Sequence, residues 1–264
     1  MIRPHLYPLP MEEESRRQNY SISSPLRQGE EAGFAAGEGS ACLFSSLDVY
    51  HDVDSRSAAL NMAIDEALLE TVTVTTIRFY QWNHPALSFG YFGKFDDVSN
   101  YQRDTVRRWT GGGIVIHAED LTYSIVIPAN DPAFAESSMS IYEKVHCGLR
   151  ATLVANGLPC ELAEDSPLSA RRSPFKAHCF ANPVRADVLS NGRKIAGAAQ
   201  RRTRRGLLQQ GSIQNANLGN GFADSFARAL CNACRQGKLN PTLLARAEEI
   251  ARQKYGTAAW LRRR

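Results

Sequence analysis

A cysteine beside a histidine, Cys179 next to His178, is the pair of residues in this sequence best suited to covalent chemistry. Three cations precede the pair, at Arg171, Arg172 and Lys176, and nearby positive charge favours the thiolate form of a cysteine. A thiolate can attack an activated acyl donor and hold the acyl group as a thioester. A loop cysteine without a chemical role is the alternative, and this stretch by itself leaves both open.

A second candidate is Lys194, which lies in the stretch 191–200, Asn-Gly-Arg-Lys-Ile-Ala-Gly-Ala-Ala-Gln. Alternate side chains of a strand share a face, so Lys194, Ala196 and Ala198 are expected to project together. One ammonium group would then lie above a floor of small residues, which suits a chain-like ligand with a polar head. A solvated strand lysine is the alternative, and the apolar residues that follow Lys194 favour burial.

Three consecutive glycines, Gly111, Gly112 and Gly113, separate two apolar segments. Without Cβ atoms, this backbone would let a ligand lie against its peptide groups, and its N–H donors could bind a phosphate or a carbonyl. A flexible hairpin loop is the alternative. An arginine pair that ends at Arg108, and His117 at the end of the next strand, favour a binding site.

Two further patterns could indicate metal binding or nucleic-acid binding. Cys231 and Cys234 form a C-x-x-C, but no second pair or histidine couple completes a zinc site, so we expect no metal. The basic segment 201–205 between two strands is a solvated hairpin tip or a docking point for an acidic carrier protein. It has no aromatic platform beside it, so no nucleic-acid partner is expected.

The composition bounds the class of protein. The chain has 264 residues, a formal net charge of +4 and 43% hydrophobic residues, which is an ordinary soluble composition. No apolar run approaches the roughly 20 residues that span a bilayer, and the N-terminus lacks the apolar core of a secretory signal. We therefore expect a cytoplasmic protein. Residues 1–42 show no sustained period and are expected to form a flexible leader before one domain at 43–264.

The hydrophobic pattern places these candidates on elements. Strands joined by short hairpins, with helices in separate blocks, predict an α+β fold with a mixed, largely antiparallel sheet. The Asn-Gly pair at 191–192 is a strong hairpin signal. Helices are predicted at 57–70, 140–155, 223–235 and 242–255, and strands at 75–80, 86–89, 106–110, 114–117, 121–127, 186–190, 193–200 and 206–213.

From about residue 43 to the end, the sequence resembles the lipoate–protein ligase and octanoyltransferase family. The resemblance implies the fold shared with biotin ligases and class II aminoacyl-tRNA synthetases, with helices flanking the sheet. The segments that carry it are 61–68 (Asn-Met-Ala-Ile-Asp-Glu-Ala-Leu), 76–82 (Thr-Ile-Arg-Phe-Tyr-Gln-Trp), 90–92 (Gly-Tyr-Phe), 107–113 (Arg-Arg-Trp-Thr-Gly-Gly-Gly), 192–200, and 254–257 (Lys-Tyr-Gly-Thr) with Trp260.

Within this family the resemblance favours the cysteine-dependent transferases. The segment 177–183, Ala-His-Cys-Phe-Ala-Asn-Pro, resembles the one that carries their nucleophilic cysteine, and Cys179 precedes Lys194 by fifteen residues, as it does there. The text His-Ala-Glu-Asp-Leu-Thr-Tyr-Ser at 117–124 is also similar to theirs, with Asp120 in place of a glutamate. The chain, moreover, ends without the accessory domain of large ligases.

Other features resemble the ligases and keep the alternatives open. Gly113 is commoner in ligases, and Asp187 stands where ligases have an aspartate. The alternatives are therefore an ATP-dependent lipoate–protein ligase, which would use ATP and Mg²⁺, and a non-catalytic acyl-binding member.

The favoured resemblance implies transfer of an octanoyl or lipoyl group from acyl-carrier protein, through a cysteine thioester, to a specific lysine. The acceptor would be a lipoyl-domain protein or the glycine-cleavage H protein. We expect the protein to need no cofactor and to be a monomer. His117 and His178 are candidates for the general base. The implied catalytic residues are Cys179 and Lys194, and the lysine would lower the pKa of the cysteine thiol. The implied substrate-binding residues are Arg108, Gly111, Gly112, Gly113, His117, Ala196, Gly197 and Gln200.

Overall fold

The computed structural model describes residues 42–164 and 183–263. These residues belong to one compact unit, Ala41–Arg264. Within the described ranges, the centre is an eight-stranded mixed sheet in the order β11-β1-β2-β6-β10-β9-β8-β7. Its strands are β1 (Leu47–Arg56), β2 (Thr76–Trp82), β6 (Leu121–Pro128), β7 (Glu161–Leu162), β8 (Val188–Ser190), β9 (Arg193–Arg202), β10 (Gly206–Ile213) and β11 (Cys234–Gly237).

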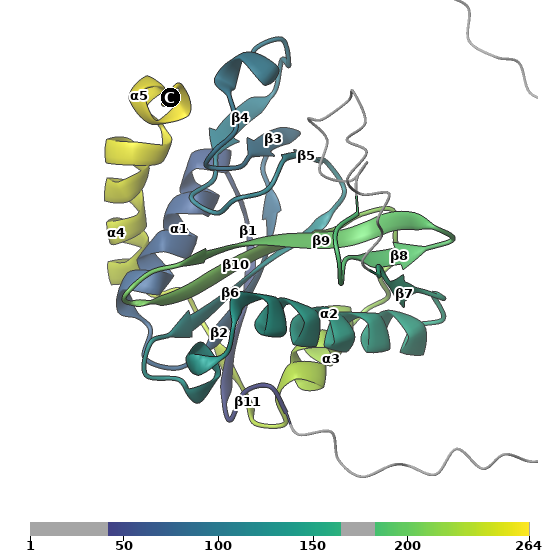
Figure 1. Ribbon diagram of the computed structural model, residues 1–264. Coiled ribbons are helices and arrows are strands. Elements are labelled where there is room, and N and C mark those ends of the chain that lie inside the picture. Colours follow the sequence, from purple (N-terminus) through teal and green to yellow (C-terminus); the bar gives the residue numbers. More distant parts are fainter. Residues whose placement is uncertain (1–41, 165–182, 264) are drawn as a thin grey trace, which may run out of the picture. The chain divides into compact units, whose positions relative to one another are not determined.

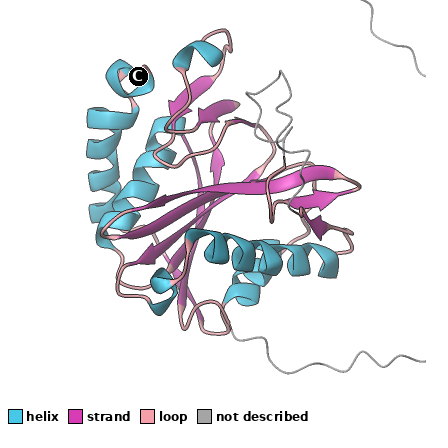
Figure 2. Cartoon of the chain, in the orientation of Figure 1, coloured by secondary structure: helices cyan, strands magenta, loops and turns pink. Residues whose placement is uncertain are grey.

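A small three-stranded sheet in the order β4-β3-β5 accompanies the central one. Helices cover both faces of the central sheet, with α1 and α4 on one side and α2 and α3 on the other (Figure 1; Figure 2 shows the same layers by element type). The small sheet contains β3 (Ala86–Phe89), β4 (Asp104–Arg107) and β5 (Ile114–His117), and the helices are α1 (Ala58–Thr71), α2 (Ser138–Ala155), α3 (Phe222–Leu230), α4 (Pro241–Ile250) and α5 (Ala258–Leu261).

Alternation along the central strands divides their side chains between two cores. On β2, Ile77 and Phe79 pack with α2 and α3, whereas Arg78 and Tyr80 face α1. On β6, Ile125 and Ile127 join the first core and Val126 the second. Polar residues that share the α1 side therefore converge on one face of the sheet.

The predicted α+β class with a mixed, largely antiparallel sheet is confirmed. Antiparallel pairing runs from β2 through β6, β10, β9 and β8 to β7, while β1 pairs in parallel with β2 and with β11. None of the helices in the two described ranges has the length and apolar character needed to cross a membrane.

The prediction fails near the C-terminal end. The predicted helix 223–235 ends at Leu230, and Cys234–Gly237 form the edge strand β11. The chain leaves the helix because β11 pairs with the outer edge of β1, a long-range contact that no local pattern records. A Cβ on Gly237 would lie 2.5 Å from Tyr50 Cε1, so only glycine permits this approach. The predicted helix 242–255 likewise continues past Ile250 only as a π-helical turn.

Two smaller differences concern strands. The predicted strand 106–110 is β4, Asp104–Arg107, because the residues that follow turn into the glycine loop. The two-residue strand β7 was not predicted, since its only support is antiparallel pairing with β8.

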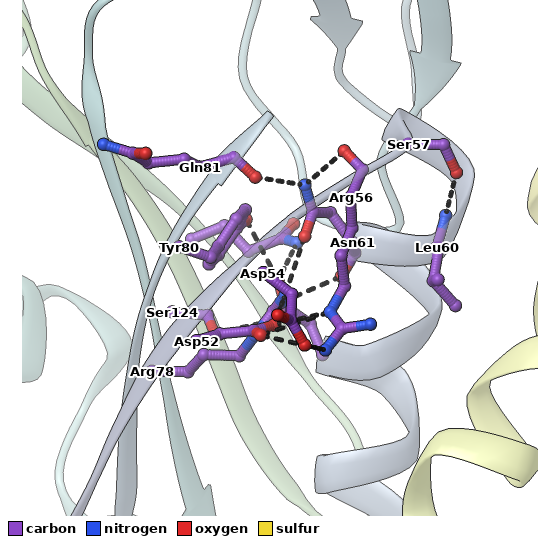
Figure 3. A network of polar contacts seen from close by, with 12 residues as sticks. Asp52, Asp54, Arg56, Ser57, Leu60, Asn61, Arg78, Tyr80, Gln81 and Ser124 are labelled. Carbon is purple, nitrogen blue, oxygen red and sulfur yellow. Dashed lines mark hydrogen bonds and ion pairs between the residues drawn. The ribbon is translucent and has the colours of Figure 1, made fainter. Parts of the chain in front are cut away.

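A buried polar network fastens α1 to the sheet. Arg78 on β2 and Asp65 on α1 are both fully buried, and Arg78 Nη1 donates to Asp65 Oδ1 at 2.9 Å. Arg78 Nη2 also donates to Asp52 Oδ2 at 2.7 Å and to Asn61 Oδ1 at 2.6 Å (Figure 3). Asp65 accepts a further bond from Ser124 Oγ at 2.7 Å. Because each buried charge has a partner, the network carries no isolated ion.

We predict that Asp65→Ala lowers the free energy of unfolding by about 3–5 kcal/mol, because it removes one of the two carboxylates that neutralise Arg78 away from water. Denaturant midpoints measure the loss. Arg235→Ala is the matched control: this arginine pairs with Asp48 while 72% exposed, and its loss should cost much less than the loss of Asp65, because water screens an exposed pair. Equal losses in both variants would contradict the prediction.

Candidate functional site

A pocket opens between the α1 side of the central sheet and the small sheet. Its empty volume is about 430 Å³, including space open to solvent. One part of the wall is apolar, with Met62, Tyr80, Trp82, Val115, Ala198 and Ala199. The polar part contains Ser88, Arg108, His117, Thr122, Lys194, Gln210 and Ser212.

His117, at the end of β5, is only 3% exposed. Its Nδ1 lies 2.8 Å from Asp120 Oδ2, its Nε2 lies 2.6 Å from Ser88 Oγ, and its ring stacks on Trp82 with centroids 4.0 Å apart. Burial lowers the pKa of His117, although the bond to Asp120 acts in the opposite direction. An ionised carboxylate only accepts, so Nδ1 carries the hydrogen and Nε2 accepts from the Ser88 hydroxyl.

Asp120 joins the two sheets. Besides His117 of the small sheet, it binds two residues of the central sheet: Thr122 Oγ1 donates to it at 2.9 Å and Ser212 Oγ at 2.7 Å. Burial acts to raise the pKa of Asp120, but the hydrogen bonds from His117, Ser212 and Thr122 outweigh it, and the pKa is lowered. Asp120 is therefore a carboxylate at neutral pH.

Arg108 belongs to the same polar wall. Its Nη1 donates to Ser88 Oγ at 2.7 Å, and its Nη2 donates to the carbonyl oxygens of Gly111 at 3.1 Å and Gly113 at 2.9 Å. The glycine loop thus wraps around this guanidinium. The neighbouring Arg107 has a different task, because it donates to main-chain carbonyls at the C-terminal end, those of Trp260, Leu261 and Arg263.

The glycine loop was predicted to bind substrate, but the described lining of the pocket does not include Gly111, Gly112 or Gly113. Gly112 has φ 84°, which favours glycine. A Cβ on Gly90 would lie 2.0 Å from Gly112 O, so β3 and the loop approach each other backbone to backbone. A Cβ on Gly111 would meet nothing within 4 Å. The close approach accounts for Gly90 and the positive φ for Gly112, and a role of the loop in binding stays a prediction.

Lys194 lines the pocket from β9. Its Nζ lies 2.8 Å from Asp187 Oδ2, and both side chains are buried. Tyr142 Oη donates to Asp187 at 2.6 Å and accepts from Ala198 N at 3.1 Å. Burial and the Asp187 charge raise the pKa of Tyr142, which keeps its hydroxyl as a donor. A Cβ on Gly197 would lie 2.3 Å from Lys194 Cε, so glycine leaves the room that the lysine occupies.

The structure brings some predicted residues together and separates others. Ala196 is fully buried and packs in the core beside α2, because the pairing of β9 with β8 shifts register here. The predicted common face of Lys194, Ala196 and Ala198 is therefore wrong. Gln200 donates to Gln209 Oε1 at 2.7 Å and is not part of the described lining. The predicted residues that meet at the pocket are Arg108, His117, Lys194 and Gly197.

The predicted nucleophile, Cys179, lies outside the described residues, as do His178 and the cations that precede them. Among the residues that the structure describes, no group of three or more His, Cys, Asp or Glu side chains could hold a metal ion. Cys231 and Cys234 are free thiols, and Cys234 Sγ donates to Cys231 O at 3.1 Å.

Sequence reasoning missed Ser88 and the place of Asp120, Thr122 and Ser212 in the site. Polar residues at alternate positions of apolar strands were the available signal, and Ser212 lies opposite Thr122 in the β10–β6 register. Ser88 left no such signal, because only the packing of the small sheet beside the central one brings it to the pocket.

We predict that Gly112→Ala lowers the free energy of unfolding by about 1 kcal/mol, because its positive φ disfavours a side chain. Gly111→Ala has open space and should stay within about 0.5 kcal/mol of wild type. Thermal melting and initial rate are measured on the same samples. A stable Gly111→Ala that loses activity would place a ligand on the loop, whereas full activity would leave the loop a role in folding alone. A Gly112→Ala variant as stable as wild type would show that a side chain at this positive φ causes no backbone strain.

The chain is similar to known proteins in sequence and in fold. Residues 57–242 match the model of the lipoyl protein ligase A/B catalytic domain. Over 168 residues the chain is 40% identical to octanoyltransferase LipM of Oceanobacillus iheyensis, and the match covers 60% of each chain. The chain thus spans about 60% of the length of that relative.

Two solved structures confirm the fold expected from the resemblance. Lipoate-protein ligase A bound with ATP matches with a TM-score of 0.63 and 18% identity, over 83% of this chain and 98% of that one. A chain of the bipartite lipoate protein ligase and its E2 lipoyl domain from Thermoplasma acidophilum matches with a TM-score of 0.57 and 18% identity, over 82% and 95%. Because the family model covers more than half of its length, the chain belongs to the lipoyl protein ligase A/B catalytic domain family.

Proposed function

We propose that the chain transfers an octanoyl or lipoyl group from acyl-carrier protein to a specific lysine of a lipoyl-domain protein or of the glycine-cleavage H protein. The group would pass through a thioester on Cys179. The observation that carries the proposal is the pocket, which sets an apolar wall with Met62 and Val115 beside the polar side chains of Lys194 and His117. A relative of 40% identity that is named an octanoyltransferase supports the same activity.

The two kinds of wall suit the two ends of an acyl group. Each CH₂ group buried against the apolar wall contributes about 0.8 kcal/mol, so an eight-carbon chain gains affinity from this wall alone. The carbonyl end would lie at the polar wall. Main-chain N–H groups near Gly197, or in the loop at Gly111–Gly113, would stabilise the oxyanion that develops during attack.

In this proposal Lys194 lowers the pKa of the Cys179 thiol. The lysine is ion-paired with Asp187, so the thiol would experience the field of a pair of opposite charges. The two partners therefore act on the thiolate in opposite directions, which makes the electrostatic argument testable.

The same ion pair favours a second candidate, an ATP-dependent lipoate–protein ligase. Asp187 stands where the ligases that this sequence resembles have an aspartate, and here it holds Lys194 at 2.8 Å. A ligase would require ATP and Mg²⁺, whereas the transferase proposal includes no cofactor. A non-catalytic acyl-binding member would bind the acyl group without turnover.

The proposal also includes the protein partners, the location and the domain bounds of the chain. The turn between β9 and β10, residues 203–205, would receive the acidic acyl-carrier protein, since opposite charge speeds encounter. Arg204 and Arg205 are exposed there, whereas Arg202 is bonded to Phe134 O and Glu136 O. We propose a cytoplasmic monomer, with a leader at 1–42 and the catalytic domain at 43–264, and without a nucleic-acid or membrane partner.

Incubation with octanoyl-carrier protein in the absence of ATP should add one octanoyl group to the chain, as measured by intact mass. Hydroxylamine should remove the group, because it cleaves thioesters. Cys179→Ala should abolish the adduct, while Cys147→Ser, which replaces an exposed thiol, should keep it. An adduct of undiminished yield in Cys179→Ala would reject the thiol route. Acylation of the acceptor only with free acid and ATP would support the ligase.

Substitutions in the ion pair should change the reactivity of Cys179 in opposite directions. Lys194→Met removes the positive partner, so the thiol pKa should rise toward the ~8.5 of a free cysteine and alkylation at neutral pH should slow. Asp187→Asn removes the negative partner and should speed alkylation. Mass-resolved iodoacetamide kinetics measure both, with melting temperatures as the check on folding. Rates that move in the same direction, or not at all, would contradict the proposed proximity of the pair to Cys179.

A further inference from the structure

Two side chains of the pocket and a carboxylate behind them form a continuous series of hydrogen bonds. Asp120 Oδ2 accepts from His117 Nδ1 at 2.8 Å, and His117 Nε2 accepts from Ser88 Oγ at 2.6 Å. Ser88 and His117 line the pocket, while Asp120 lies behind them in contact with the central sheet. The series therefore ends at the space where a substrate would lie.

The hydroxyl of Ser88 has one acceptor position left after its bonds to the chain. A serine oxygen carries one hydrogen and two lone pairs. The hydrogen is donated to His117 Nε2, and one lone pair accepts from Arg108 Nη1 at 2.7 Å. The second lone pair can accept a hydrogen bond from a donor in the pocket.

We propose that Ser88, His117 and Asp120 act as a proton relay that takes the proton from the amine that accepts the acyl group. The inference rests on the proposed transfer of that group from a thioester to a lysine.

This reaction needs such a base. The acceptor lysine first loses its ammonium proton to water. Attack of the neutral amine on the thioester carbonyl then forms the C–N bond and leaves the nitrogen positively charged. Ser88 Oγ takes one proton from the nitrogen as its own proton moves to His117 Nε2. The C–S bond then breaks, and the proton returns through Ser88 to the leaving thiolate. The products are an amide and a thiol, and the relay is restored without any other reactant.

The surroundings of His117 suit a group that receives a proton and gives it back. Burial lowers its pKa, so the ring is neutral and able to accept at neutral pH. Asp120 holds the tautomer with Nε2 toward Ser88 and stabilises the imidazolium that forms, as an aspartate behind a catalytic histidine does. The positive charge of Arg108, which donates to Ser88, opposes that imidazolium and favours return of the proton.

The test separates the two half-reactions. Each variant is loaded with octanoyl-carrier protein, excess donor is removed, and transfer to a lipoyl-domain protein is followed by intact mass in a single turnover. His117→Gln keeps polar atoms near Ser88 and Asp120 but cannot take a proton. We expect acyl-enzyme formation to stay within about threefold of wild type and transfer to fall about 100-fold or more. Ser88→Ala, a smaller change, should reduce transfer about tenfold or more.

Hydroxylamine as acceptor distinguishes a base from a positioning group. Hydroxylamine is a weak base, so the positively charged nitrogen of its adduct is more acidic than that of an alkylamine and can lose its proton to water. His117→Gln should therefore release the octanoyl group to it at nearly the wild-type rate. The control is His51→Gln, which alters an Asp–His pair outside this pocket, with Asp224 at 2.9 Å, and should leave both half-reactions unchanged.

Normal transfer to the lysine by both His117→Gln and Ser88→Ala, with melting temperatures near that of wild type, would overturn the relay. An equal loss with lysine and with hydroxylamine would also overturn it, because the residues would then only position the thioester. If wild-type chain forms no hydroxylamine-sensitive adduct, the proposed function itself fails and the relay falls with it.

Discussion

The buried charge of Arg78 is the constraint on which the rest of the site depends. A guanidinium enclosed between a helix and a sheet must be neutralised, and Asp52 and Asp65 do so at 2.7 and 2.9 Å. Asp65 also accepts from Gln210 Nε2 at 2.7 Å, and Gln210 Oε1 accepts from Thr110 Oγ1 at 2.8 Å. One network therefore fixes α1, a residue of the pocket wall and the start of the glycine loop.

The pocket contains two more buried pairs in which a carboxylate is the hydrogen-bond partner of a basic side chain. Lys194 and Asp187 lie on and beside the central sheet, whereas His117 belongs to the small sheet and reaches Asp120 in the turn after it. Asp120 is bonded to residues of both sheets, so the distance between the sheets is set by hydrogen bonds at the site. Lys194 and the proposed proton-handling residues Ser88 and His117 thus come from different sheets, and their alignment depends on this junction.

Local pattern was sufficient for some elements and for part of the site. The predicted ranges 86–89, 114–117 and 206–213 coincide with β3, β5 and β10, because a strand is indicated by the types of consecutive residues. The family, the α+β class and the convergence of Arg108, His117 and Lys194 also followed from motifs in the sequence. The prediction that Cys179 is the nucleophile lies outside the described residues and stays a prediction.

Only the tertiary structure decided the features that depend on partners distant in the chain. The edge strand β11 forms because its backbone pairs with the outer edge of β1. Ala196 lies in the core because the pairing of β8 with β9 shifts register. In the folded chain Arg107 donates to main-chain carbonyls at the C-terminal end, whereas Arg108 lines the pocket. Ser88 lies within hydrogen-bond distance of His117. Sequence alone determined which residues could do chemistry and which segments form regular strands, since period and residue type are local. Long-range hydrogen bonding and packing determined which of them meet, because those partners are set by the folded chain as a whole.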